Sequence, residues 1–101
     1  MSFADTLKTL PESAGEALLL TDAAGAEVAT IVNGPGTAGS FRVYAYLAGK
    51  HGAIDAAAAA EGLAIYAEHT ADARLHPGKH PNIDRLFPIA AGGAALTATL
   101  R

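Results

Sequence analysis

The sequence contains no cysteine and no tryptophan among its 101 residues, and only three Phe and three Tyr. The absence of cysteine excludes disulfides, thiolate nucleophiles and thiolate-bound metals. This fits a reducing compartment, so we expect a cytoplasmic protein. Half of the residues are apolar, but alanine and glycine supply much of that half. We therefore expect closely packed helices rather than a large aromatic core.

Basic residues and long apolar runs are also scarce. Seven Lys and Arg against ten Asp and Glu give a net charge of −3, which offers no basic surface for nucleic acid. The most continuous apolar run, residues 56–60, is all alanine and far shorter than the ~20 residues that span a bilayer. Residues 1–15 lack the pattern of a signal peptide. We expect a soluble protein with no nucleic-acid and no membrane partner.

The length predicts a single domain over residues 1–101, which begins with a helix and a β-hairpin. Ser2 and Asp5 have the spacing of a capping box, and Pro11 ends the first short helix. Residues 17–21 and 27–33 are rich in strand formers and flank the sequence DAAG, which is typical of a type I turn.

Helices are expected in the middle of the chain. The segment FRVYAYL at 41–47 alternates like a strand but continues into a helix-compatible sequence, and we favour a helix over 41–51 capped by Ser40. Asp55 is a good N-cap for the strongest predicted helix, 56–70. Its apolar stripe includes Tyr66.

The C-terminal part predicts a short helix and a final strand. Asn82 can cap a helix that Pro88 interrupts. Residues 96–101 alternate like a strand with Leu96, Ala98 and Leu100 on its buried face. The resulting fold class is α+β: a small antiparallel sheet of about three strands, covered on one face by three to four helices.

Three of the four histidines lie in HTADARLHPGKHPNIDR, residues 69–85. In HPGK, Pro77 and Gly78 fit the two central positions of a type II turn, and Gly78 should have a positive φ. Convergence of the histidines with a carboxylate would give a site for zinc or another divalent ion. The alternative is a rigid surface turn with no metal, which we favour. The weak metal candidates are His69, Asp72, His76 and His80, with Asp84 as a further carboxylate.

The loop GPGTAGS at 34–40 precedes the predicted helix and would place backbone N–H groups and two hydroxyls at its positive end. Gly34, Gly36 and Gly39 have the spacing G-x-G-x-x-G, but the preceding hairpin contradicts the βαβ context of a dinucleotide site. An anion or phosphate ligand could be held by this loop together with the 76–80 turn. The ligand-binding candidates are Gly36, Thr37, Gly39, Ser40, Arg42, His76, Lys79 and His80.

No spacing in the sequence positions a nucleophile with its base. We therefore expect a non-enzymatic binding or interaction domain with no cofactor, ahead of a small-anion-binding protein and a histidine-based metal-dependent enzyme. A homodimer is also expected. It would form through a sheet edge or through Tyr46 and Arg42 on the outer side of the 41–51 helix.

The motifs GPGTAGSFRVY, AIDAAAAAEGL, AEHTADAR and HPGKHPNIDRL, in this order and spacing, resemble a small bacterial family known only as domain of unknown function 2322. The resemblance spans nearly the whole chain. It implies no activity, substrate or ligand, and no site residue is carried over from it.

Overall fold

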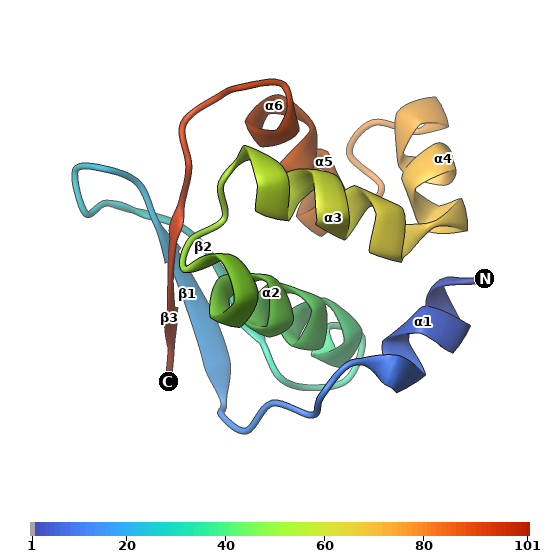
Figure 1. Ribbon diagram of the computed structural model, residues 1–101, viewed down its shortest axis with the longest axis horizontal. Coiled ribbons are helices and arrows are strands. Elements are labelled where there is room, and N and C mark those ends of the chain that lie inside the picture. The colour runs from blue at the N-terminus through green and yellow to red at the C-terminus, as the bar shows by residue number, and fades with distance from the viewer. Residues whose placement is uncertain (1) are drawn as a thin grey trace.

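The computed structural model describes residues 2–101, which form a three-stranded antiparallel sheet with helices on one side of it (Figure 1). The α+β class predicted from the sequence is confirmed. The elements in chain order are α1 (Phe3–Thr9), β1 (Ala17–Thr21), β2 (Glu27–Val32), α2 (Ala38–His51), α3 (Ala56–Tyr66), α4 (Glu68–Leu75), α5 (Pro81–Asp84), α6 (Leu86–Ala90) and β3 (Thr97–Leu100).

Local hydrogen bonds form the first elements as the sequence predicts. The Ser2 hydroxyl accepts the Asp5 N–H at 3.2 Å and caps α1. In the hairpin turn, the Gly25 N–H donates to the Asp22 carbonyl at 3.0 Å, and φ of Gly25 is 83°. The Asp22 carboxylate accepts two further N–H groups of the turn.

The strand order is β2-β1-β3, so the C-terminal strand returns to pair with the first strand of the hairpin. Leu18 lies between Ile31 and Leu100 in the register. Leu18, Leu20 and Ile31 point to the helical side and are buried. The helix α2 contacts all three strands and separates the sheet from the other helices (Figure 1).

The 41–51 segment is a helix, as favoured, but the predicted cap is wrong. The helix begins at Ala38 with Thr37 as the N-cap residue. Ser40 therefore lies inside the first turn, and its hydroxyl accepts a hydrogen bond from Tyr66 at 2.8 Å. Ser40 lies next to α3, so its hydroxyl bonds to Tyr66, which is distant in sequence, instead of capping the helix.

The predicted helix 56–70 is also wrong, because it is broken at Ala67 into α3 and α4. Asp55 caps α3 as expected and accepts the Ala58 N–H at 2.8 Å. Ala67 has φ 50° and ψ −114°, which no helix can contain. The buried Thr70 donates its hydroxyl to the Leu63 carbonyl at 2.6 Å across the break.

Two predictions near the C-terminus need correction. His80, not Asn82, is the N-cap residue of α5, and the helical break falls at Arg85 rather than at Pro88. Pro88 is the third residue of α6, where its missing N–H would have no intrahelical partner. Leu100 is 51% exposed although it points to the helical side, because β3 is an edge strand.

Candidate functional site

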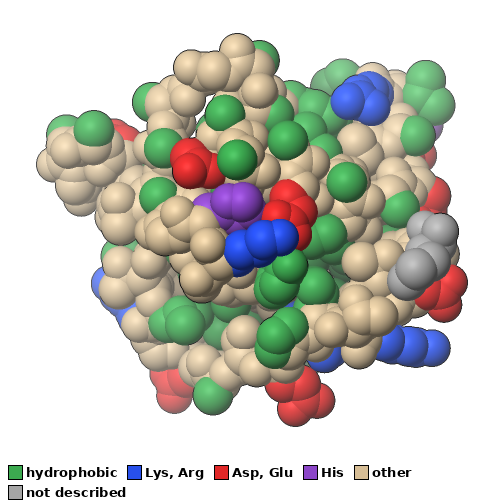
Figure 2. All heavy atoms as spheres, viewed as in Figure 1, with side chains coloured by type: hydrophobic (Ala, Val, Ile, Leu, Met, Phe, Trp, Pro, Cys, Tyr) green, Lys and Arg blue, Asp and Glu red, His purple; other side chains and the backbone are tan. Residues whose placement is uncertain are grey.

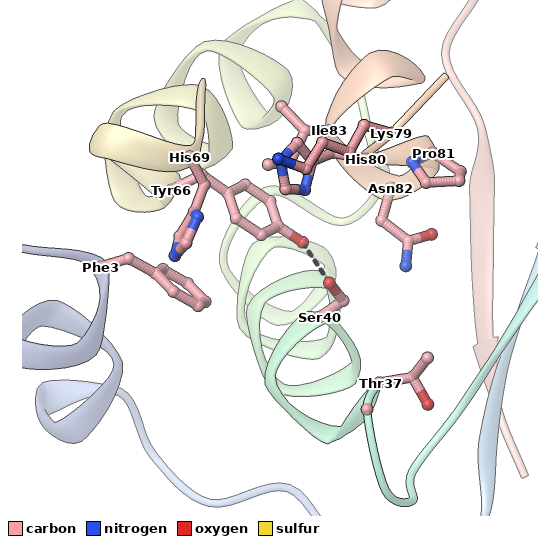
Figure 3. Close-up of a pocket in the computed structure, with 11 residues that line it drawn as sticks. Phe3, Thr37, Ser40, Tyr66, His69, Lys79, His80, Pro81, Asn82 and Ile83 are labelled. Atoms are coloured by element: carbon pink, nitrogen blue, oxygen red, sulfur yellow. Dashed lines mark hydrogen bonds between the residues drawn. The ribbon is translucent and has the colours of Figure 1, made fainter. Parts of the chain in front are cut away.

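The candidate site is a cavity of about 380 Å³ between the start of α2 and the turn that precedes α5. We call it the histidine pocket. Figure 3 shows three walls: rings from α1, α3 and α4 on one side, the residues around His80 above, and the first turn of α2 below. The pocket is lined by Phe3, Gly36, Thr37, Ser40, Tyr66, His69, Lys79, His80, Pro81, Asn82 and Ile83.

Two segments singled out in the sequence meet in this pocket although about 40 residues separate them. Gly36, Thr37 and Ser40 come from the glycine-rich loop and the start of α2, and Lys79 and His80 come from the 76–80 turn. The predicted positive φ of Gly78 is confirmed at 91°. The Lys79 N–H donates to the His76 carbonyl at 3.1 Å and closes the turn.

The other sequence candidates lie elsewhere. Gly39 and Arg42 line a second cavity, of about 330 Å³. The Arg42 guanidinium donates to the carbonyls of Leu10 and Pro11. His76 is exposed and is not among the residues that line the histidine pocket.

Asp72 ties the turn to α4 from outside the pocket lining. Its Oδ2 lies 2.6 Å from His80 Nε2 and 3.1 Å from Lys79 Nζ, and its Oδ1 lies 3.2 Å from His76 Nδ1. These hydrogen bonds and the Lys79 charge hold the pKa of the Asp72 carboxyl well below its usual range. Asp72 is therefore ionised at neutral pH.

The contacts around Asp72 differ from a metal site. Across residues 2–101, no three histidine or carboxylate side chains are placed to hold one metal ion. Asp84, the further carboxylate considered from the sequence, accepts the Gly78 N–H at 2.8 Å. Its carboxylate thus stabilises the turn instead of facing the histidines.

Aromatic rings form the apolar wall, and sequence reasoning missed most of it. Phe3 stacks on Tyr66 at 5.1 Å between ring centroids, and His69 meets the edge of Phe3 at 5.3 Å. The rings of His69 and His80 lie 5.8 Å apart. Phe3 is not among the site residues predicted from the sequence, because no local pattern shows that α1 packs against the end of α3.

Several polar groups at the floor of the pocket already form hydrogen bonds with other protein groups. Burial raises the pKa of Tyr66, so its phenol stays protonated and donates to Ser40. The Thr37 hydroxyl donates to the Val32 carbonyl at 2.6 Å, and α2 consequently has no side-chain cap within the described chain. The Asn82 side-chain oxygen accepts from Arg85 at 2.8 Å. The Asn82 amide nitrogen can then donate to a ligand in the pocket.

Comparison with known proteins assigns the chain to a family. Residues 3–100 match the family of uncharacterized proteins conserved in bacteria, DUF2322. The chain belongs to this family. No curated protein matches the chain. No solved structure matches it either. The resemblance noted in the sequence is thus confirmed, and the family brings no activity with it.

Proposed function

We propose that this DUF2322 protein is a small cytoplasmic, non-enzymatic domain that binds a small organic anion in the histidine pocket. The observation that carries the proposal is the lining of the pocket. It combines Lys79 and two histidines with hydroxyl and amide groups, and none of its lining residues in the described chain, 2–101, carries a carboxylate. An anion placed there would meet hydrogen-bond donors and the Lys79 ammonium, which also contacts Asp72.

The size and shape of the pocket favour a compact ligand. Its volume of about 380 Å³ falls at the lower end of the roughly 300–1,000 Å³ range of small-molecule sites. The ring wall of Phe3, Tyr66 and His69 suits a planar apolar group, because offset and edge contacts between rings add to simple burial. An aromatic ring that carries one acid group would contact the ring wall and also the hydrogen-bond donors of the lining.

The alternatives receive less support. For a nucleophilic enzyme, Ser40 would need a base, but its hydroxyl accepts a hydrogen bond from a protonated tyrosine. For a nucleic-acid partner, a continuous basic surface would be needed, and Figure 2 shows side chains of both signs dispersed over one face. Among the helices of residues 2–101, none is long and apolar enough to cross a bilayer.

Titration with benzoate and with inorganic phosphate tests the proposal. Benzoate carries both the ring and the acid group, so we expect it to bind more tightly than phosphate. A ligand that binds only the native state raises the melting temperature; at a hundred times Kd the free energy of unfolding increases by about 2.7 kcal/mol. Both calorimetric heat and a melting shift should be measured.

Two lysine variants locate the binding. Lys79→Gln removes a charge that lines the pocket and should weaken benzoate binding about tenfold, the equivalent of one charge-assisted contact. Lys50→Gln is the matched control, because Lys50 forms a similar ion pair with Glu61 at 3.0 Å away from the pocket. Equal effects of the two substitutions, or no binding of either probe, would show that the proposed function is wrong.

A further inference from the structure

The Asp72 carboxylate fixes which nitrogen of His80 carries a hydrogen. Asp72 Oδ2 lies 2.6 Å from His80 Nε2. An ionised carboxylate can only accept hydrogen bonds, so Nε2 must donate. This holds for the neutral ring and for the imidazolium alike. The carboxylate therefore determines the tautomer of neutral His80.

The other nitrogen, Nδ1, is then the ring atom left for a ligand. His80 lines the pocket and its side chain is 24% exposed. In the neutral ring Nδ1 carries a lone pair, which repels an anion and accepts a hydrogen bond from a donor. In the protonated ring Nδ1 carries a hydrogen and donates to an anion. Protonation of Nδ1 thus changes the site from one that favours a hydrogen-bond donor to one that favours an anion.

Other titratable groups surround His80 in and around the pocket. The Tyr66 phenol stays protonated because burial raises its pKa. His69 contacts the rings of Phe3 and His80. From α4, Asp72 and His69 lie next to His80, and His76 is connected to it through Asp72. The remaining neighbours in the pocket and the turn are Lys79 from the turn, Tyr66 from α3, Ser40 from α2 and Phe3 from α1.

We propose that the histidine pocket binds its organic anion together with one proton, which His80 Nδ1 takes up. The inference rests on the function proposed above and adds the regulation of the same site. A neutral amide of the same shape behaves differently, because its N–H can donate to the lone pair of neutral His80 and its carbonyl can accept from Nδ1–H of the protonated ring.

Calorimetry with benzoate and benzamide between about pH 6 and pH 8.5 tests the inference, since imidazoles change charge in this range. Benzoate should lose affinity as the pH rises, with a slope that approaches tenfold per pH unit once neutral His80 dominates. Repeating the titration at the upper end of this range in two buffers of different ionisation enthalpy should give an uptake approaching one proton. Benzamide should bind with little dependence on pH and little proton uptake.

Three variants assign the proton. His80→Gln should remove the pH dependence of benzoate binding, whereas His76→Gln should retain it, because His76 contacts Asp72 without lining the pocket. His69→Gln should also retain it. If His80→Gln does not fold, the His80 ring resonances of the wild-type protein serve instead, and benzoate should move their titration midpoint to higher pH.

The possible failures are distinguishable. If benzoate binds equally at all pH values and takes up no proton, the inference is wrong and the proposed function stands. If the linkage survives in His80→Gln or disappears in His69→Gln, the proton resides on another group and the inference is likewise overturned. If benzoate and phosphate both fail to bind at any pH, the proposed function itself is wrong.

Discussion

Ala67 is a strained residue between α3 and α4. Its φ of 50° with ψ of −114° is a conformation that side chains rarely adopt, and such residues store roughly 1–3 kcal/mol. Glycine adopts it freely but loses about 0.5–1 kcal/mol of chain entropy. We predict that Ala67→Gly raises the free energy of unfolding by about 1 kcal/mol in urea titrations.

Ala64→Gly is the matched control for this prediction. Ala64 is exposed in the regular part of α3, where the same substitution should lower the free energy of unfolding by about 1 kcal/mol. Equal losses in both variants would show that Ala67 carries no strain. Since Tyr66 and His69 lie on either side of the break and line the pocket, the strained residue sets the direction of the ring wall.

Asp72 makes the stability depend on pH in the acid range. Its carboxyl has a lowered pKa in the folded state because His80, Lys79 and His76 contact it. The stabilisation is fully present above the ordinary Asp value of 3.8 and is lost as the pH falls from there toward the lowered folded value. We predict that wild-type protein loses more stability than Asp72→Asn between about pH 5 and pH 2.

Thermal unfolding across this pH range, with both proteins in the same buffers, measures the difference. Glu27→Gln is a suitable control, because Glu27 lies on β2 and contacts only Thr30 among the side-chain hydrogen bonds of residues 2–101. Parallel pH profiles for wild type and Asp72→Asn would contradict the prediction.

At the scale of elements, the 76–80 turn is a rigid unit. Gly78 has a φ of 91°, and its N–H donates to Asp84 Oδ2 at 2.8 Å. We predict that Gly78→Ala lowers the free energy of unfolding by about 1 kcal/mol or more, because alanine is strained at this φ although no neighbour would touch its Cβ. Denaturant titration gives the value.

Gly49→Ala provides the comparison. Gly49 lies in the regular part of α2, and an added Cβ would meet open space there. The Gly49→Ala substitution should therefore stabilise the protein by up to about 1 kcal/mol. A neutral effect of Gly78→Ala would mean that the turn does not hold Lys79 and His80 in place, which would remove the support for one wall of the pocket.

At the scale of the whole molecule, no helix of residues 2–101 covers the outer face of the sheet (Figure 1). Leu19 lies at its centre between Thr30 and Thr99, and Val28 and Val32 are about half exposed beside them. The helical surface considered from the sequence is already used, because Tyr46 donates to Glu61 at 3.0 Å and Arg42 holds two carbonyls. We propose that a homodimer would form through the sheet.

Sedimentation at micromolar concentration tests this proposal. We predict a species of twice 10.2 kDa for the wild type and a monomer for Val32→Glu, which places a charge on the outer face. Leu75→Glu is the matched control, because Leu75 is 76% exposed on α4 and distant from the sheet. A wild-type monomer, or dissociation by Leu75→Glu, would exclude the sheet as the interface.

The sequence by itself determined those features that depend on a few neighbouring residues. The Ser2 cap, the Asp22–Gly25 turn, the Asp55 cap and the positive φ of Gly78 all follow from hydrogen bonds or dihedral limits within five residues. Alternating and helical periodicity then sufficed for the three strands and most of the helices, because each buries one face against a common core.

Only the tertiary structure decided the break at Ala67 and the composition of the pocket. Helix propensity favours an unbroken 56–70 segment, but the buried Thr70 hydroxyl and the packing of Phe3 on Tyr66 outweigh it. The meeting of Ser40 with His80 likewise depends on how α2 and the 76–80 turn pack around α3. Such contacts join residues far apart in the chain, and their energies arise only once the core has formed, so no local pattern in the sequence records them.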